Sequence, residues 1–172
     1  MGQTQNRIHE GDLAPDFSLK DQENKEIRLS DLKGKRVLLS FHPLAWTPVC
    51  THQMSSPEKN TSRFAELNTI PLGIRVDSQP CKAAWVEHLG IKSTRLLADF
   101  WPGGGAAMAL GLFREKHGFS ERANVILNED QKVVFVKVYP SSELSDIDEV
   151  LSFLSRKWGG LGAPGRKLGC SR

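Results

Sequence analysis

Cysteine is scarce in this chain of 172 residues, which contains only Cys50, Cys81 and Cys170. Three cysteines are too few for the disulfide framework of a small secreted domain, and cysteines outside such frameworks are more often catalytic, redox-active or metal-binding. A metal site is poorly supported, because the sequence has no Cys-x-x-Cys pair and Cys50 has only His52 close to it. We therefore expect a reactive thiol and no bound metal or other cofactor.

Long apolar runs are also missing. No stretch of about 18 uncharged apolar residues occurs, so the sequence predicts no membrane-spanning helix and no membrane partner. Residues 1–7 are polar and lack the apolar core of a signal peptide. Together, these two absences indicate a cytoplasmic protein.

A widespread basic surface is missing as well. The net charge is +3, and residues 159–172 carry Arg166, Lys167 and Arg172 with no acidic residue, so the excess belongs to this stretch. No basic stripe with interleaved aromatic residues occurs elsewhere, which argues against a nucleic-acid partner. Residues 159–172 also hold five glycines and lack apolar periodicity. We predict one domain over residues 1–158, followed by a flexible, glycine-rich basic tail.

Strand-like and helix-like patterns alternate along the rest of the chain. Residues 36–41 form a nearly continuous apolar run, typical of a strand buried on both faces, and residues 70–76 form a second one. A helical stretch follows each strand. The first runs from Cys50 to about residue 67 and is kinked or divided near Pro57, and the second covers residues 80–89.

The remaining segments complete a mixed sheet. Short strands are predicted within 16–29 and at 96–98, 123–127 and 132–139, with a short helix ending near residue 111 and an amphipathic helix at 144–157. Alternating strands and helices, followed by a hairpin and a closing helix, predict an α/β sandwich with a mixed central sheet flanked by helices.

The stretch most informative for chemistry joins strand 36–41 to the next helix and runs from Pro43 to Cys50. Sites in α/β proteins gather at the carboxyl ends of strands, where this loop lies. Cys50 falls in the expected first turn of the helix, whose free N–H groups and dipole favour a thiolate. Thr47 could place its hydroxyl beside the sulfur. Taken alone, the pattern also fits a buried cysteine that merely packs.

The motif Pro43-x-x-x-Thr47-x-x-Cys50 resembles the active-site motif of the peroxiredoxins, the alkyl hydroperoxide reductase and thiol-specific antioxidant family. The resemblance extends over residues 8–155. The other matching residues occur in the family's order: Gly11, Ala14, Pro15, Asp16, Phe17, Leu19, Leu29, Ser30, Gly34, Lys35, Asp77, Ser78, Ala84, Trp85, Asp99, Gly111, Arg122 and Ala123. The resemblance implies a thioredoxin-like fold and thiol-dependent reduction of hydrogen peroxide and organic hydroperoxides.

The resemblance also implies roles for individual residues. Cys50 would be the attacking cysteine, Thr47 would hydrogen-bond the thiolate and the peroxide, and Pro43 would shield the sulfur from water. Arg122 would lie beside Cys50 and polarise the peroxide. Gln53 stands where relatives often carry a carboxylate or amide that orients the site, although a solvated helix residue is an equal reading.

His42 occupies a position where relatives usually have an aromatic residue. Its imidazole could titrate near neutral pH or could pack as a buried ring. Four aromatic residues near the motifs could form an apolar wall, a dimer interface or part of the core: Trp46, Phe100, Trp101 and Phe113. A homodimer is expected from the resemblance.

Peroxide attack would leave a sulfenic acid on Cys50, which a second thiol must resolve. Cys81 is the first candidate, because it follows strand 70–76 near a helix start and would share an edge with Cys50 if the two strands are neighbours. Otherwise Cys81 merely packs and an external thiol acts on a one-cysteine enzyme. Cys170 lacks the Val-Cys-Pro context of relatives that resolve across a dimer. A thioredoxin-like or other thiol reductant would complete turnover.

Two further readings of the thiol are a disulfide oxidoreductase and a redox sensor. Disulfide exchange favours a Cys-x-x-Cys pair, whereas this chain has Thr47 at the first position. A sensor role in addition to catalysis stays open.

Overall fold

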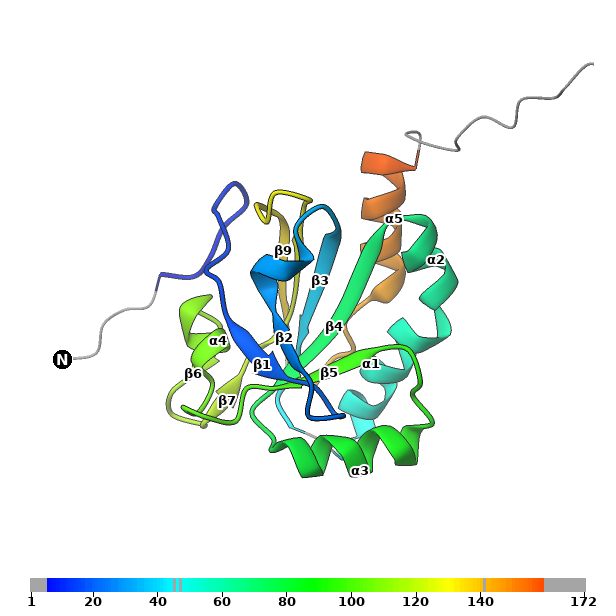
Figure 1. The fold of residues 1–172 in the computed structure, drawn as a ribbon. Helices are drawn as coiled ribbons and strands as arrows, with labels where there is room; N and C mark the ends of the chain where they lie inside the picture. The colour runs from blue at the N-terminus through cyan, green and yellow to red at the C-terminus, as the bar shows by residue number, and fades with distance from the viewer. Residues whose placement is uncertain (1–5, 45, 47, 141, 160–172) are drawn as a thin grey trace, which may run out of the picture.

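The computed structural model describes residues 6–44, 46, 48–140 and 142–159. Its main sheet has the strand order β2-β1-β5-β4-β3-β8-β9, and a separate hairpin pairs β6 with β7 (Figure 1). The strands are β1 (Ser18–Lys20), β2 (Glu26–Arg28), β3 (Arg36–Phe41), β4 (Thr69–Arg75), β5 (Arg95–Ala98), β6 (Phe113–Arg114), β7 (Phe119–Ser120), β8 (Arg122–Leu127) and β9 (Val133–Tyr139). The helices are η1 (Leu29–Leu32), α1 (Pro48–Lys59), α2 (Thr61–Glu66), α3 (Gln79–Leu89), α4 (Gly105–Ala109) and α5 (Ile147–Trp158).

Strand β3 lies inside the sheet, parallel to β4 and antiparallel to β8. All six of its residues are buried. Leu38 packs with Ile126 in a cluster that includes residues of α2 and α5, whereas Val37, Leu39 and Phe41 belong to the cluster on the opposite face. Because both faces are covered, the strand needs no polar side, and the predicted mixed sheet with flanking helices is confirmed.

The helix predicted after Cys50 is two helices. α1 ends at Lys59 and α2 begins at Thr61, so the break falls at Asn60 and Pro57 lies inside α1. A proline within a helix removes one backbone hydrogen bond from the preceding turn, which weakens the last turn of α1. The division was predicted, but its position was three residues too early.

The closing helix begins later than its apolar pattern predicted. Leu144 is half exposed and lies outside α5, which starts at Ile147. The side chain of Asp146 caps this start, because its Oδ1 accepts hydrogen bonds from the backbone N–H groups of Asp148 at 2.9 Å and Glu149 at 3.1 Å. The cap therefore sets the boundary more strongly than the apolar spacing. Within the described residues, no helix combines the length and apolarity needed to span a bilayer.

Candidate active site

Three neighbouring strands bring chemically active side chains to one edge of the sheet. Phe41, at the end of β3, pairs with Ile74 of the parallel strand β4 and with Ala123 of the antiparallel strand β8. The segments that follow β3 and β4 therefore meet the beginning of β8. Cys50 and Cys81 come from these two segments, and Arg122 is the first residue of β8.

Cys50 is the third residue of α1, in the first turn, where the sequence placed it. Only 1% of the residue is exposed. The Nη2 group of Arg122 donates a hydrogen bond to its Sγ atom at 3.5 Å, and Arg122 is itself buried. A buried guanidinium and the N-terminus of a 12-residue helix both favour negative charge on this sulfur.

Gln53 holds the guanidinium in place. Its Oε1 accepts a hydrogen bond from Nη1 of Arg122. Its Nε2 donates to Oγ of Ser40 at 3.0 Å and to the carbonyl oxygen of Phe41 at 3.4 Å. Gln53 is buried, so the solvated-helix reading is wrong. The amide links β3, α1 and β8 and fixes the direction in which Arg122 faces the sulfur.

His42 and Pro43 follow β3 directly, and both are buried. Burial, together with the nearby cations Arg75 and Lys82, holds the pKa of His42 well below its ordinary value. Its Nδ1 lies 3.1 Å from the carbonyl oxygen of Ser40, which can only accept, so Nδ1 carries the proton. Of the two alternatives, the structure supports a packed neutral ring.

Two residues of interest lie outside the described part of the chain. Thr47, the motif threonine, and Cys170, the alternative resolving cysteine, both fall there, as does most of the predicted tail at 159–172. Their assigned roles stay predictions.

Cys81 is the third residue of α3. It is half-buried and packs against the apolar cluster that contains Cys50, Met54 and Trp85. Strands β3 and β4 are parallel neighbours, as the sequence analysis required for Cys50 and Cys81 to lie at the same edge of the sheet. Both thiols are free. Sγ of Cys81 donates to Oδ1 of Asp77 at 3.8 Å, a contact that the sequence did not suggest.

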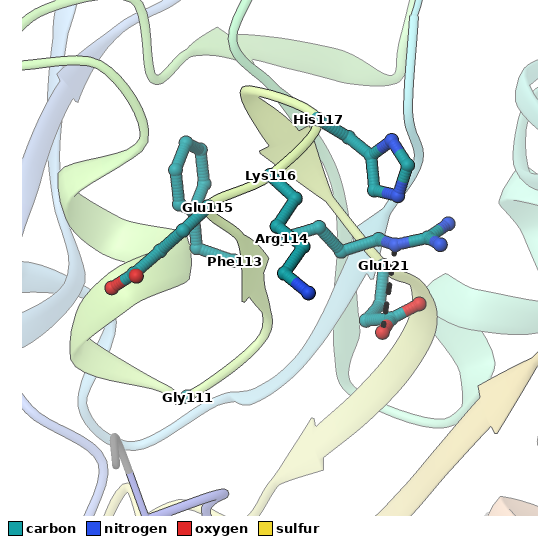
Figure 2. Close-up of a pocket in the computed structure, with 7 residues that line it drawn as sticks. All are labelled: Gly111, Phe113, Arg114, Glu115, Lys116, His117 and Glu121. Carbon is teal, nitrogen blue, oxygen red and sulfur yellow. Dashed lines mark ion pairs between the residues drawn. The ribbon is translucent and has the colours of Figure 1, made fainter. Parts of the chain in front are cut away.

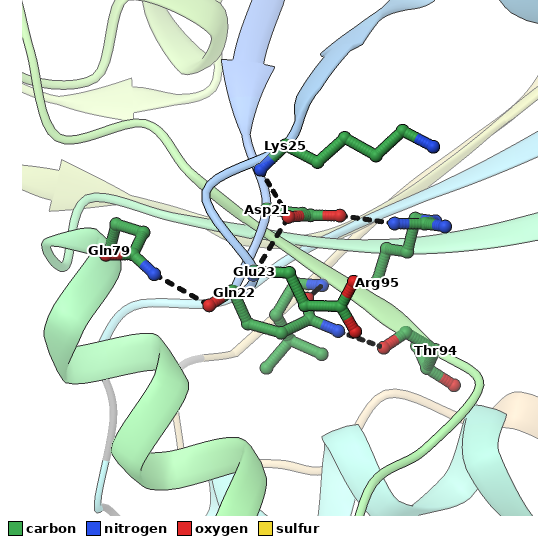
Figure 3. A network of polar contacts seen from close by, with 8 residues as sticks. Asp21, Gln22, Glu23, Lys25, Gln79, Thr94 and Arg95 are labelled. Atoms are coloured by element: carbon green, nitrogen blue, oxygen red, sulfur yellow. Dashed lines mark hydrogen bonds and ion pairs between the residues drawn. The ribbon is translucent and has the colours of Figure 1, made fainter.

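The start of α3 is anchored to the turn between β1 and β2 (Figure 3). Nε2 of Gln79, the first residue of the helix, donates to the carbonyl oxygen of Gln22 at 2.6 Å. The Gln22 side chain in turn accepts from the backbone N–H of Leu96 at 2.9 Å, and Arg95 pairs with the buried Asp21. Cys81 therefore lies on a helix turn that is fixed to the sheet.

Two buried cations near the thiols were missed from the sequence. Arg75, the last residue of β4, is fully buried and stacks on the Trp85 ring with 3.7 Å between its Cζ and the ring centroid. Lys82, beside Cys81, is also fully buried. A charged residue at the end of an apolar run looks like an edge residue, and only the tertiary packing shows that it points inward.

The hairpin β6–β7, also unpredicted, leads into β8 (Figure 2). It borders a groove at Gly111 and carries an ion pair between Nε of Arg114 and Oε1 of Glu121 at 3.9 Å. Oγ of Ser120 donates to the carbonyl oxygen of His42 at 3.4 Å. This contact ties the residues just before Arg122 to the loop that precedes Cys50.

The four aromatic residues singled out from the sequence do not act as one wall. Phe113 packs against the main core. Trp46, Phe100 and Trp101 are 53%, 57% and 84% exposed, and Trp46 packs against the His88 ring at a centroid distance of 5.2 Å. Of the four residues, only Phe113 is part of the core. A role of the other three in a dimer interface stays a prediction.

A buried thiol in the first turn of a helix, paired with a guanidinium at the edge of such a sheet, defines a thiol-based redox protein of thioredoxin-like fold. The AhpC/TSA family profile matches residues 11–136. The chain belongs to this family, the peroxiredoxins, and is a thiol-dependent peroxidase.

Individual relatives agree with this assignment. The chain is 31% identical over 140 residues to alkyl hydroperoxide reductase E of Mycobacterium tuberculosis, which covers 81% of this chain and 91% of that protein. It is 31% identical over 151 residues to peroxiredoxin-1 of Gekko japonicus, with coverages of 82% and 75%. The solved peroxidoxin BcpB from M. tuberculosis superposes with a TM-score of 0.78 at 29% identity, covering 87% and 98% of the chains. The reduced 2-Cys peroxiredoxin of Plasmodium vivax gives 0.77 at 26% identity, covering 88% and 86%.

Proposed function

We propose that Cys50 is the thiolate that attacks the hydroperoxide and that Arg122 stabilises both the thiolate and the transition state. The observation that carries this proposal is the 3.5 Å hydrogen bond from Arg122 Nη2 to Cys50 Sγ in a buried site. A cationic donor fixed beside the reacting sulfur is already oriented for the charge that develops during attack. Gln53 contributes by holding that donor.

The reaction transfers one oxygen to sulfur. The Cys50 thiolate attacks the nearer oxygen in line with the O–O bond, which breaks, and the departing oxygen leaves as water or an alcohol after taking up a proton. Cys50 becomes a sulfenic acid. Thr47 would donate to the peroxide, as its place in the motif suggests. Pro43, which is buried beside the end of β3, would keep water from the sulfur.

For the second half of the cycle, we propose that Cys81 of the same subunit resolves the sulfenic acid. Support comes from the parallel pairing of β3 and β4 and from the packing of Cys81 against the cluster that contains Cys50. A thioredoxin-like partner would then reduce the disulfide. The alternative is a one-cysteine cycle in which an external thiol acts directly on Cys50. A homodimer is proposed from the family alone.

One experiment separates these cycles. Reduced protein is treated with one equivalent of hydrogen peroxide, and its cysteines are mapped by mass spectrometry under non-reducing conditions. A Cys50–Cys81 disulfide within one chain is expected, and it should persist in Cys170→Ser. Sulfenic acid on Cys50 with Cys81 still free would establish the one-cysteine cycle. Cys50→Ser should abolish peroxide turnover, and retained turnover would refute the assignment of Cys50.

A further inference from the structure

One carboxylate connects the proposed resolving thiol to a buried cation. Asp77 lies between β4 and α3. Its Oδ1 accepts from Cys81 Sγ at 3.8 Å, and its Oδ2 lies 3.3 Å from Nε of Arg75. The two oxygens thus face different partners, a thiol on one side and a guanidinium on the other. Peroxide attack at Cys50 uses neither contact.

Arg75 is held firmly enough to fix this carboxylate. Its guanidinium is fully buried and lies over the Trp85 ring. Burial lowers the pKa of Arg75 to about 10, and the opposing effects of Asp77, Cys50 and Cys81 keep the guanidinium charged at neutral pH. Arg75 is therefore a permanent cation within electrostatic range of both sulfurs.

Cys81 must lose its proton in order to attack. The thiolate is the nucleophile in thiol exchange, so the proton of the thiol has to be removed before or during the attack. The first turn of the 11-residue helix α3 favours the thiolate, and the bond from Gln79 to Gln22 fixes that turn. What the reaction still needs is an acceptor for the proton, and Asp77 Oδ1 is in contact with the sulfur that carries it.

We propose that Asp77 is the general base of the resolution step and that Arg75 is the residue that positions it. The proposal rests on the proposed role of Cys81. The proton of Cys81 passes to Oδ1 of Asp77 while the Cys81 sulfur attacks the sulfur of the Cys50 sulfenic acid. An S–S bond forms and the S–O bond breaks. The departing hydroxide takes up one proton and leaves as water. The Cys81 sulfur is oxidised from the thiol to the disulfide, and the Cys50 sulfur is reduced from the sulfenic acid to the same disulfide.

Other charged or titratable groups lie within electrostatic range of this cluster: Arg75 on β4, Lys82 on α3, Cys50 on α1, Arg122 on β8, His42 after β3 and Asp99 after β5. Among them, Lys82 is a competing base. Its amine has no hydrogen-bond partner within the described part of the chain, and burial holds its pKa well below the ordinary value. Asp77 contacts the Cys81 sulfur directly at 3.8 Å, however, whereas Lys82 interacts with Cys81 electrostatically.

The test measures sulfenic acid formation and disulfide formation separately. Full-length reduced protein is mixed with one equivalent of hydrogen peroxide, quenched in acid at increasing times and analysed by non-reducing mass spectrometry. In Asp77→Asn, which keeps the shape of the side chain, disulfide formation at pH 7 should slow by about 100-fold, the lower end of what a positioned base contributes. Asp148→Asn is the matched control, because this carboxylate lies on α5 and is 80% exposed.

The pH profile distinguishes a base from a structural carboxylate. Without its base, Asp77→Asn should rely on hydroxide to remove the thiol proton, so its rate of disulfide formation should rise by up to about tenfold per pH unit. The defect should therefore shrink in alkali, whereas a misfolded site would be slow at every pH. The proposal would be overturned if Asp77→Asn kept the wild-type rate and pH profile. It would also be overturned if Lys82→Met, and not Asp77→Asn, formed the disulfide slowly at pH 7 and recovered in alkali.

Arg75 is tested by charge rescue. Arg75→Gln should slow disulfide formation, and Arg75→Lys, which retains a cation near Asp77, should recover most of the rate. Equal rates in these two variants would refute the positioning role. If the wild-type protein forms no Cys50–Cys81 disulfide at all, the assignment of Cys81 fails, and the role of Asp77 falls with it. A normal wild-type disulfide with an unaffected Asp77→Asn variant refutes the role of Asp77 alone.

Discussion

Gln53→Met tests how far the reactivity of Cys50 depends on the residue that accepts a hydrogen bond from Arg122. Methionine has a similar length and fills the buried site, but it cannot replace the hydrogen bonds of the amide. The bond that Gln53 accepts from the Arg122 guanidinium involves a charged donor and contributes about 1.5–3 kcal/mol. The bond to Ser40 at 3.0 Å contributes about 1 kcal/mol more. The free energy of unfolding should therefore fall by about 2.5–4 kcal/mol.

The same change should slow oxidation of Cys50, because Arg122 loses the acceptor that aims it. We expect the second-order rate constant with hydrogen peroxide to fall at least tenfold, equivalent to about 1.4 kcal/mol in the barrier. Urea unfolding gives the stability, and rapid quenching with mass spectrometry gives the rate.

Gln131→Met is the matched control for Gln53→Met. Gln131 is also buried, and its amide donates to the carbonyl oxygen of Leu29, away from the thiols. This variant should lose stability and keep the oxidation rate. If Gln53→Met oxidises at the wild-type rate while losing stability, Gln53 serves only the fold and the reasoning about Arg122 is wrong.

Three further predictions concern single side chains. Arg122→Ala should slow oxidation of Cys50 by about 100-fold or more in the same rapid-quench assay, and Arg122→Lys should recover part of the rate. His42 stays neutral in the folded protein because burial and nearby cations lower its pKa. Below its unfolded pKa of about 6.5 only the unfolded chain gains this proton, so the free energy of unfolding should fall by up to roughly 1.4 kcal/mol per pH unit. The His42→Phe variant should therefore show urea midpoints that change less between pH 5 and 7. Partial burial acts to raise the pKa of Glu58, but backbone N–H groups of residues 92–94 donate to it and lower it overall. The stability that Glu58 contributes is thus present above pH 4.5 and is lost as the pH falls through the pKa of Glu58 in the folded protein. Glu58→Gln should therefore lower the free energy of unfolding by about 1–3 kcal/mol at pH 7 and by less in acid, as measured by urea unfolding.

The elements that carry the site were predictable because their sequence signals are local. Strand β3 showed a nearly continuous apolar run, and α3 ends at Leu89 before Gly90, whose positive φ of 65° suits glycine. Cys50 occupies the helix turn that its motif predicted. The hairpin β6–β7 was missed because strands of two residues are too short to show a period.

Contacts between distant segments were the part that local patterns could not supply. The sequence named Gln53 and Arg122, but 69 positions separate them, and their bond depends on β8 lying against β3. Arg75 and Asp77 were not recognised as a pair serving Cys81, because their relation depends on the Trp85 ring and on where α3 begins. Such groups become visible only when the helices are placed on the sheet.

The strand pairing of β4, β3 and β8 also makes this protein a reporter of its own folding. Cys50 follows the end of β3 and Arg122 begins β8, 72 positions later in the chain, and their contact requires β8 to pair with β3 in register. A collapsed chain that has not yet formed this pairing has the thiol without the guanidinium. Peroxide reactivity during refolding would therefore mark the moment at which the second half of the chain joins the first.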